Sequence, residues 1–139
     1  MKLILVDDNV AFRQGLREYL ENELGHEVIA EVGSGEEFLA LKSTIWDADI
    51  VLMDIVMGGL NGIQTTKAVL EEIYRLKVVA ITLNIEDSYL VEFVEAGFKG
   101  FINKNEIFKT LEPTLHNVMC GRYIFPPELK VANENNNNY

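Results

Sequence analysis

Features that would narrow the function of this chain at once are mostly missing. The 139 residues include a single cysteine, Cys120, so no internal disulfide can form, and no zinc-binding or redox cysteine spacing exists. No apolar run approaches the roughly 18 residues that span a bilayer. The four apolar residues after Lys2 are too few for the core of a signal peptide. We therefore expect a cytoplasmic protein without a membrane segment.

Positive charge is also scarce. The 12 Lys and Arg residues stand against 22 Asp and Glu residues, which gives a net charge of −10. Nucleic-acid binding needs clustered Lys and Arg to neutralise phosphates, so we expect no direct nucleic-acid binding by this segment. The 48% hydrophobic and 24% charged residues are ordinary for a globular protein, and the length fits one domain with a substantial core.

Short apolar runs alternate along the chain with segments of helical spacing. The five strand-like runs cover residues 3–6, 28–32 (the weakest), 50–53, 78–81 and 100–102. The helical segments cover residues 12–24, a segment opened by a capping box at 34–37, then 63–73, 89–96 and 111–118. This alternation predicts an α/β fold, with a doubly wound parallel sheet and helices on both faces.

The C-terminal part of the pattern is less regular. Pro113 falls inside the last helical segment, where a proline removes one hydrogen bond and clashes with the preceding turn. That helix should therefore either kink at Pro113 or begin later than its spacing suggests. After Gly121 the chain contains Pro126-Pro127 and ends in an asparagine-rich stretch with little to bury. We expect one domain over residues 1–121 and a partly disordered linker or tail over 122–139.

Polar residues follow four of the predicted strands at the point where each strand ends. They are Asp7 and Asp8 after the first, Asp54 after the third, Thr82 after the fourth and Lys104 after the fifth. Ligands of such sheets bind beyond the carboxyl ends of the strands, where the strand order reverses. One aspartate at a strand end is more often a turn or cap residue, but this joint pattern indicates a site.

Phosphoryl chemistry fits these residue types. Three carboxylates in one pocket would raise one another's pKa unless a cation compensates them, and Mg²⁺ prefers such oxygen ligands. Asp54 can act as a carboxylate nucleophile, while Mg²⁺ and Lys104 neutralise the transferring group. Glycines at 58, 59 and 62 leave the next loop open, so backbone N–H groups near Ile55 and Val56 can approach phosphoryl oxygens.

At these residues the sequence resembles the receiver domains of two-component response regulators. The matching stretches are 4–8, 52–57 with Gly62, 80–82 and 100–104, and the resemblance runs from about residue 2 to residue 121. It implies a flavodoxin-like (βα)5 fold with strand order 2-1-3-4-5. It also implies a signalling protein and not an enzyme, in which Asp54 accepts phosphate from a sensor histidine kinase.

The resemblance assigns the metal and phosphoryl ligands residue by residue. Asp8, Asp54 and the backbone carbonyl of Val56 would bind Mg²⁺, with Asp7 assisting through water. Thr82 and Lys104 would contact the phosphoryl group. The backbone groups expected to do the same are those of Ile55, Val56 and Leu83.

The resemblance also implies a switch formed by Thr82 and Phe101. On phosphorylation the Thr82 hydroxyl would swing toward the phosphate and the Phe101 ring would turn inward. The surface formed by the fourth helix, fifth strand and fifth helix would then change. Within the fourth helical segment, the apolar residues of 89–94 cover more than one stripe of the helix, which suggests a partner face or a homodimer.

A narrower resemblance is to the LuxR/NarL-type subgroup. It rests on residues 96–101 with Lys104-Asn105, and on residues 121–123 leading to 127–129. In that subgroup a DNA-binding output domain follows the receiver, and this sequence contains no such domain. The sequence leaves open whether the chain is a fragment or acts as a receiver alone.

Two departures from the family are Gly58 and the pair Lys104-Asn105, where many receivers have Lys-Pro. Most receivers have proline where this chain has Gly58, so an unphosphorylated receiver-like module that only binds proteins remains an alternative. A Mg²⁺-dependent phosphohydrolase would need a second acid two residues after Asp54, where this chain has Val56. Val56 and Asn84 lie where the family tunes phosphate loss, and an apolar Val56 predicts slow hydrolysis.

Overall fold

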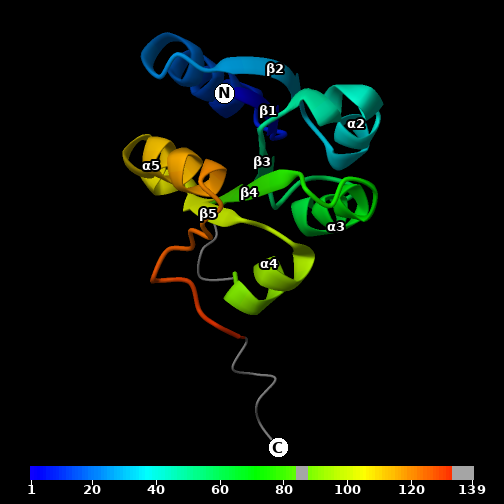
Figure 1. The fold of residues 1–139 in the computed structure, drawn as a ribbon, viewed down its shortest axis with the longest axis vertical. Coiled ribbons are helices and arrows are strands. Elements are labelled where there is room, and N and C mark those ends of the chain that lie inside the picture. The colour runs from blue at the N-terminus through cyan, green and yellow to red at the C-terminus, as the bar shows by residue number, and fades with distance from the viewer. Residues whose placement is uncertain (84–87, 133–139) are drawn as a thin grey trace, which may run out of the picture.

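A five-stranded parallel sheet forms the centre of the protein (Figure 1). The structure is a computed structural model that describes residues 1–83 and 88–132, so Asn84 lies outside the described residues. The strands are β1 (Lys2–Val6), β2 (Glu27–Val32), β3 (Ile50–Asp54), β4 (Lys77–Thr82) and β5 (Gly100–Asn103). Every pairing is parallel and the order is β2-β1-β3-β4-β5. The predicted flavodoxin-like fold with order 2-1-3-4-5 is confirmed.

Helices cover both faces of the sheet. Helices α1 and α5 pack on one face, and α2, α3 and α4 pack on the other (Figure 1). Residues 50–53 of β3 are completely buried, which explains why this strand is apolar at every position. The helical elements are α1 (Val10–Glu18), η1 (Tyr19–Glu23), α2 (Gly35–Leu39), η2 (Lys42–Asp47), α3 (Gly62–Glu72), α4 (Leu90–Ala96), η4 (Lys104–Glu106) and α5 (Ile107–Met119).

Side-chain caps begin three of the α-helices. Asn9 accepts a hydrogen bond from the Phe12 N–H and begins α1 directly after the aspartate pair. Asn61 and Gln64 form a complete capping box at the start of α3. At the predicted capping box of α2, the Ser34 hydroxyl accepts from the Glu37 N–H. The caps of α1 and α3 determine where the loops after β1 and β3 end.

Helix α5 begins earlier than the sequence suggested. It runs from Ile107 with Pro113 inside it, so of the two alternatives, a kink or a later start, the later start is wrong. Four buried side chains anchor it to the sheet, namely Ile107, Leu111, Leu115 and Val118. Pro113 lies on the exposed side of the helix, where water can satisfy the carbonyl that a proline leaves without a partner. Within the described residues, no helix is long and apolar enough to cross a membrane.

The chain after α5 folds back onto the sheet, which differs from the expected tail with little to bury. We call residues 123–132 the C-terminal strap. Ile124 pairs in parallel with Gly100 of β5, and Tyr89 pairs with Lys130 just before α4. Leu129 is only 6% exposed and belongs to the core on the α4 side. The division into a domain over 1–121 and a tail stays a prediction, and residues 133–139 lie outside the described part.

Candidate functional site

The acidic residues meet at the carboxyl ends of β1 and β3. These two strands are neighbours, and the strand order reverses between them. Asp7 and Asp8 follow β1, and Asp54 is the last residue of β3. One carboxylate oxygen from each of the three aspartates lies within 4.8 Å of the others. The sheet topology therefore brings together residues that are almost 50 positions apart in the sequence.

Lys104 brings positive charge to this acidic cluster. Its Nζ lies 2.7 Å from Oδ2 of Asp7 and 3.6 Å from Oδ1 of Asp54. The Asp7 side chain is only 1% exposed, so its ion pair with Lys104 is protected from water. The Lys104 ammonium also lies 4.5 Å from the centre of the Phe12 ring, a cation–π arrangement. Lys104 thus reaches from the end of β5 across to both β1 and β3.

Asp54 is held in an environment that disfavours its charge. Burial and the neighbouring carboxylate of Asp7 raise the pKa of Asp54 to about 6, and Asp8 acts in the same direction. The ammonium of Lys104 and the N–H of Ile55 oppose this rise in pKa, but they offset only part of it. The cluster therefore carries more negative charge than its own residues neutralise.

This excess charge fits a hard divalent cation. Carboxylate oxygens from three aspartates are suitable ligands for Mg²⁺, which binds oxygen and keeps several waters. The Val56 side chain is 60% exposed, so the loop directly after Asp54 is open to solvent. Asp8 is also exposed, which leaves one side of the cluster accessible. The carboxylates of Asp7, Asp8 and Asp54 therefore fit a Mg²⁺ ion.

The remaining predicted residues lie on β4 and β5. Thr82 is the last residue of β4, is 2% exposed, and pairs in register with Asn103, the residue before Lys104. The following residue, Leu83, is 55% exposed. Phe101 is 2% exposed and packs edge-on against Phe93 of α4, with ring centroids 5.0 Å apart. Phe101 thus lies in the apolar layer beneath α4, and its ring already points inward.

Two glycines of the loop after Asp54 differ in their surroundings. A Cβ atom on Gly62 would lie 2.2 Å from the carbonyl oxygen of Asp54, and the Gly62 N–H donates to the Ile55 carbonyl at 2.9 Å. Only glycine permits this close approach, which ties the start of α3 to the end of β3. A Cβ atom on Gly58 would meet nothing within 4 Å. The position at which most receivers have proline therefore lies in open space.

Three residues that contact the acidic cluster or Lys104 were not identified from the sequence. Asn9 donates its backbone N–H to Oδ1 of Asp7 at 2.8 Å. Arg13 donates to the Asp7 carbonyl at 2.6 Å and forms an ion pair with Glu31 at 3.3 Å. The Phe12 ring lies against the Lys104 ammonium. Asn9 was recognisable as a helix cap, but the contacts of Arg13 and Phe12 depend on residues far away in the chain.

Comparison with known proteins identifies a family that matches most of the chain. The family described as "Response regulator receiver domain" matches residues 3–116. Response regulator protein VraR from Staphylococcus aureus (strain NCTC 8325 / PS 47) is 30% identical over 135 residues, which is 97% of this chain and 64% of VraR. This chain therefore spans a little under two thirds of the length of that relative.

Solved structures share the fold over nearly the whole chain. A two-component response regulator of the LuxR family from Aurantimonas sp. SI85-9A1 has a TM-score of 0.75 at 25% identity, with 92% of this chain and 91% of that chain covered. The isolated REC domain of RcsB from Salmonella enterica serovar Typhimurium, in the presence of the phosphomimetic BeF3−, has a TM-score of 0.79 at 21% identity. That match covers 93% of this chain and 95% of the other, and it supports the fold alone.

Proposed function

This chain belongs to the response regulator receiver domain family, and we propose that it accepts a phosphoryl group on Asp54 from a sensor histidine kinase. One observation carries the proposal. The Asp54 carboxylate lies in one cluster with the carboxylates of Asp7 and Asp8 and the ammonium of Lys104. A nucleophile, a cation-binding oxygen set and a positive charge are thereby combined at one edge of the sheet.

In the transfer step, an Asp54 carboxylate oxygen attacks phosphorus. An O–P bond forms as the P–N bond to the kinase histidine breaks, and the electron pair of that bond returns to the imidazole nitrogen, which then takes up a proton. The Lys104 ammonium, 3.6 Å from Asp54, is close enough to neutralise charge on the arriving phosphoryl oxygens. Backbone N–H groups of Ile55, Val56 and Leu83 would donate to the same oxygens.

Mg²⁺ is part of this proposal, because the same cluster would bind it. Mg²⁺ held by Asp8, Asp54 and the Val56 carbonyl, with Asp7 assisting through water, would supply the positive charge that Lys104 alone does not. The raised pKa of Asp54 supports this assignment, because a bound cation would return the carboxylate to its ionised, nucleophilic form. Asp7 would act in the outer shell, since its Oδ2 already pairs with Lys104 at 2.7 Å.

We infer that phosphorylation is read out through β4, β5 and the neighbouring helices. Thr82 ends β4, Lys104 directly follows β5, and Phe101 connects β5 with α4 through its contact with Phe93. Val91 and Val94 of α4 are 38% and 51% exposed, which leaves a small apolar area for a partner or a second copy. A DNA-binding output domain, absent from this sequence, would receive the signal. The cytoplasmic location stays a prediction.

A phosphohydrolase is not favoured by the site. The position two residues after Asp54, where such an enzyme needs an acid, holds the exposed side chain of Val56. With no acid or amide there to orient water, we expect the aspartyl phosphate to be long-lived.

Incubation of the full chain with acetyl phosphate and Mg²⁺, followed by intact mass measurement, tests the proposal. We expect the mass of one added phosphoryl group on the wild type, none with EDTA, and none on Asp54→Asn. Asp47→Asn is the matched control, because it makes the same change at an exposed aspartate outside the cluster. A wild type that stays unmodified, or an Asp54→Asn variant that is still modified, would contradict the assignment.

A further inference from the structure

The C-terminal strap contacts two elements of the proposed readout surface, β5 and α4. Its first contact is with the edge of β5. The Ile124 N–H donates to the Lys99 carbonyl at 3.1 Å, and the Phe101 N–H donates to the Ile124 carbonyl at 2.9 Å. The strap thus adds a short parallel pairing beyond β5, the last strand of the sheet. An exposed sheet edge is thereby covered by the chain's own C-terminal part.

The second contact is with the start of α4. The first N–H groups of a helix have no partner within the helix, and Tyr89 at the start of α4 provides no side-chain cap. The strap supplies the missing acceptors: the Leu90 N–H donates to the Lys130 carbonyl at 2.6 Å, and the Val91 N–H donates to the Val131 carbonyl at 3.0 Å. Helix α4 spans only Leu90–Ala96, too short to be stable through its own hydrogen bonds. Its first turn therefore depends on the strap.

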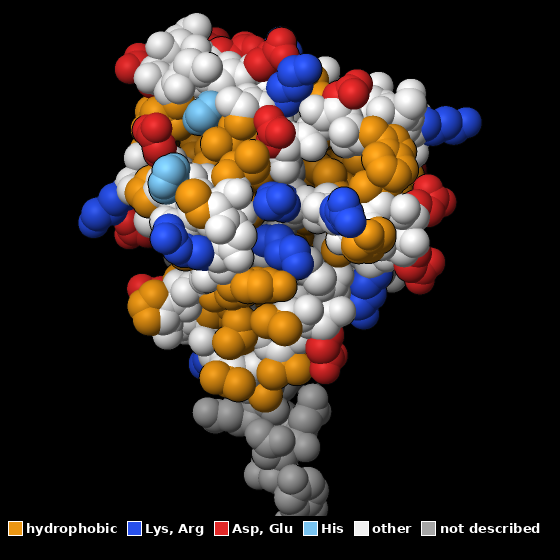
Figure 2. Space-filling model, viewed as in Figure 1, with side chains coloured by type: hydrophobic (Ala, Val, Ile, Leu, Met, Phe, Trp, Pro, Cys, Tyr) orange, Lys and Arg blue, Asp and Glu red, His pale blue; other side chains and the backbone are white. Residues whose placement is uncertain are grey.

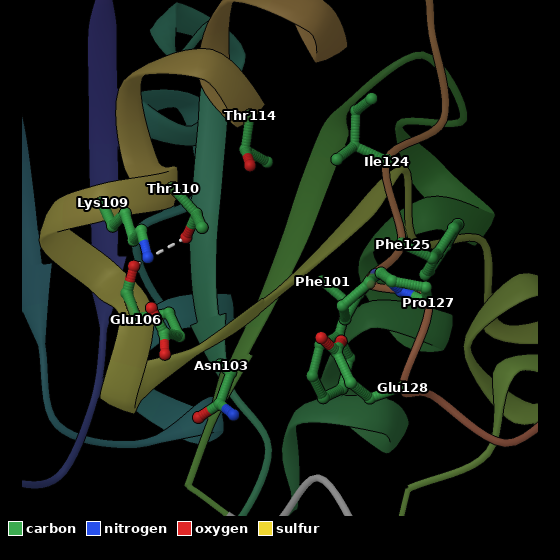
Figure 3. A pocket seen from close by; sticks show the side chains of 11 residues that line it. Phe101, Asn103, Glu106, Lys109, Thr110, Thr114, Ile124, Phe125, Pro127 and Glu128 are labelled. Carbon is green, nitrogen blue, oxygen red and sulfur yellow. Dashed lines mark hydrogen bonds between the residues drawn. The ribbon is translucent and has the colours of Figure 1, made fainter.

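A cavity links the strap to the ring of Phe101. It has a volume of about 510 Å³ and lies between α5 with its preceding turn, β5 and the strap (Figure 3). Phe101 lines it from the sheet, and Ile124 and Phe125 line it from the strap. If the Phe101 ring left its edge-on contact with Phe93, it would enter this cavity and meet the strap. The ring and the strap therefore line one cavity, so a change in the position of either alters the surroundings of the other.

Hydrophobic side chains hold the strap in this place. Leu129 is 6% exposed and packs into the same core cluster as Phe93 and Phe101. Figure 2 shows hydrophobic side chains gathered over the lower part of this face, where the strap and α4 lie.

We propose that the docking of the strap is coupled to phosphorylation of Asp54, so that each stabilises the other; this inference rests on the proposed function. The structure pairs the docked strap with an inward Phe101 ring, and the inward ring is the position that phosphorylation is expected to favour. By thermodynamic linkage, the factor by which phosphorylation favours the docked strap is also the factor by which the docked strap favours phosphorylation. The strap thereby reports the state of Asp54 to any segment that follows it.

Hydrogen exchange on the full chain tests the coupling directly. The chain is phosphorylated with acetyl phosphate and Mg²⁺, and intact mass gives the modified fraction in the same sample. We expect the amides that bond across the strap, those of Leu90, Val91, Phe101 and Ile124, to exchange about five-fold or more slowly after phosphorylation. If no adduct forms, the proposed function fails and the coupling fails with it. If the adduct forms and these amides exchange unchanged or faster, only the coupling is overturned.

A pair of strap variants tests the reverse direction. Leu129→Ala removes the buried anchor, whereas Val131→Ala shortens a side chain that is 66% exposed and keeps its backbone carbonyl. Neither residue touches the acidic cluster. With beryllofluoride and Mg²⁺ as the probe, we expect Leu129→Ala to bind about five-fold or more weakly and Val131→Ala to bind like the wild type. Equal affinity of a folded Leu129→Ala variant, checked by thermal unfolding, would contradict the proposal.

Discussion

Strand β3 contains two buried regions that differ in kind although they are adjacent. Residues 50–53 are apolar and completely buried, and they contribute to stability by removing hydrocarbon from water. Asp54, the next residue, is 4% exposed but carries a carboxylate whose ionisation its surroundings disfavour. The same strand thus stabilises the fold along its length and ends on a carboxylate whose charge is disfavoured. Burial by itself does not reveal which of these two effects a residue has.

Truncation in the apolar region should give the largest change in stability. Leu52→Ala removes a completely buried side chain from the centre of the sheet. We expect the free energy of unfolding to fall by about 2–5 kcal/mol, because transfer free energy is lost and a cavity remains. Urea unfolding measures this change. Leu83→Ala, at a leucine that is 55% exposed, is the control and should stay within about 0.5 kcal/mol of the wild type. Similar losses of stability in both variants would contradict the difference expected between a buried and an exposed leucine.

Neutralising the Asp54 carboxylate should raise the free energy of unfolding instead of lowering it. In EDTA at pH 8, we expect Asp54→Asn to unfold with a free energy about 1–3 kcal/mol higher than that of the wild type, because the variant no longer buries a disfavoured charge. The pKa of Asp54 rises from an ordinary 3.8 to about 6 on folding. Between these pH values the folded wild type holds a proton that the unfolded chain has lost. Wild-type stability should therefore fall as pH rises through this window and level off above it.

Urea unfolding of both proteins at several pH values measures this difference. The advantage of Asp54→Asn should shrink as the pH falls from about 6 to below 3.8, because well below 3.8 the wild-type carboxyl is protonated in both states. Added Mg²⁺ should narrow the gap at pH 8, since a ligand that binds the folded wild type stabilises it. A variant that is less stable than the wild type at pH 8 in EDTA would show that Asp54 is not held in a disfavoured state.

The smallest expected effect concerns the loop that follows these two regions. Gly58→Ala should raise the free energy of unfolding by about 0.4–1 kcal/mol, because alanine restricts the unfolded chain and its Cβ meets open space. Gly62→Ala is the matched control and should lower stability, since its Cβ would collide with the Asp54 carbonyl. Thermal unfolding separates the two. Destabilisation by Gly58→Ala would show that this loop needs a glycine for more than space.

Sequence reasoning succeeded for the sheet and for the residues at its carboxyl edge. Completely buried strands must be apolar throughout, so 50–53 and 78–81 could be read directly as strands. In a parallel sheet all carboxyl ends meet at one edge, so polar residues after different strands had to converge. The structure brings Asp7, Asp8, Asp54 and Lys104 together as this rule requires.

The same reasoning was less successful where contacts depend on distant partners. It placed the start of α5 too late, because local proline chemistry was outweighed by the burial of Ile107 and Leu111. It expected little burial after Gly121, because a short segment with two prolines shows no periodicity of its own. Leu129 is buried only because α4 and β5 provide a surface for it.

The sequence by itself determined the parallel sheet, its strand order by resemblance, and the edge at which the charged residues gather. Periodicity and strand ends are local properties, and the rules of parallel sheets convert them into positions in space. Only the tertiary structure decided that Lys104 pairs with Asp7 above the Phe12 ring, that the Phe101 ring lies inward, and that the strap caps α4. Each of these contacts joins segments far apart in the chain, and no local pattern specifies which distant surface a side chain or a free N–H group will meet.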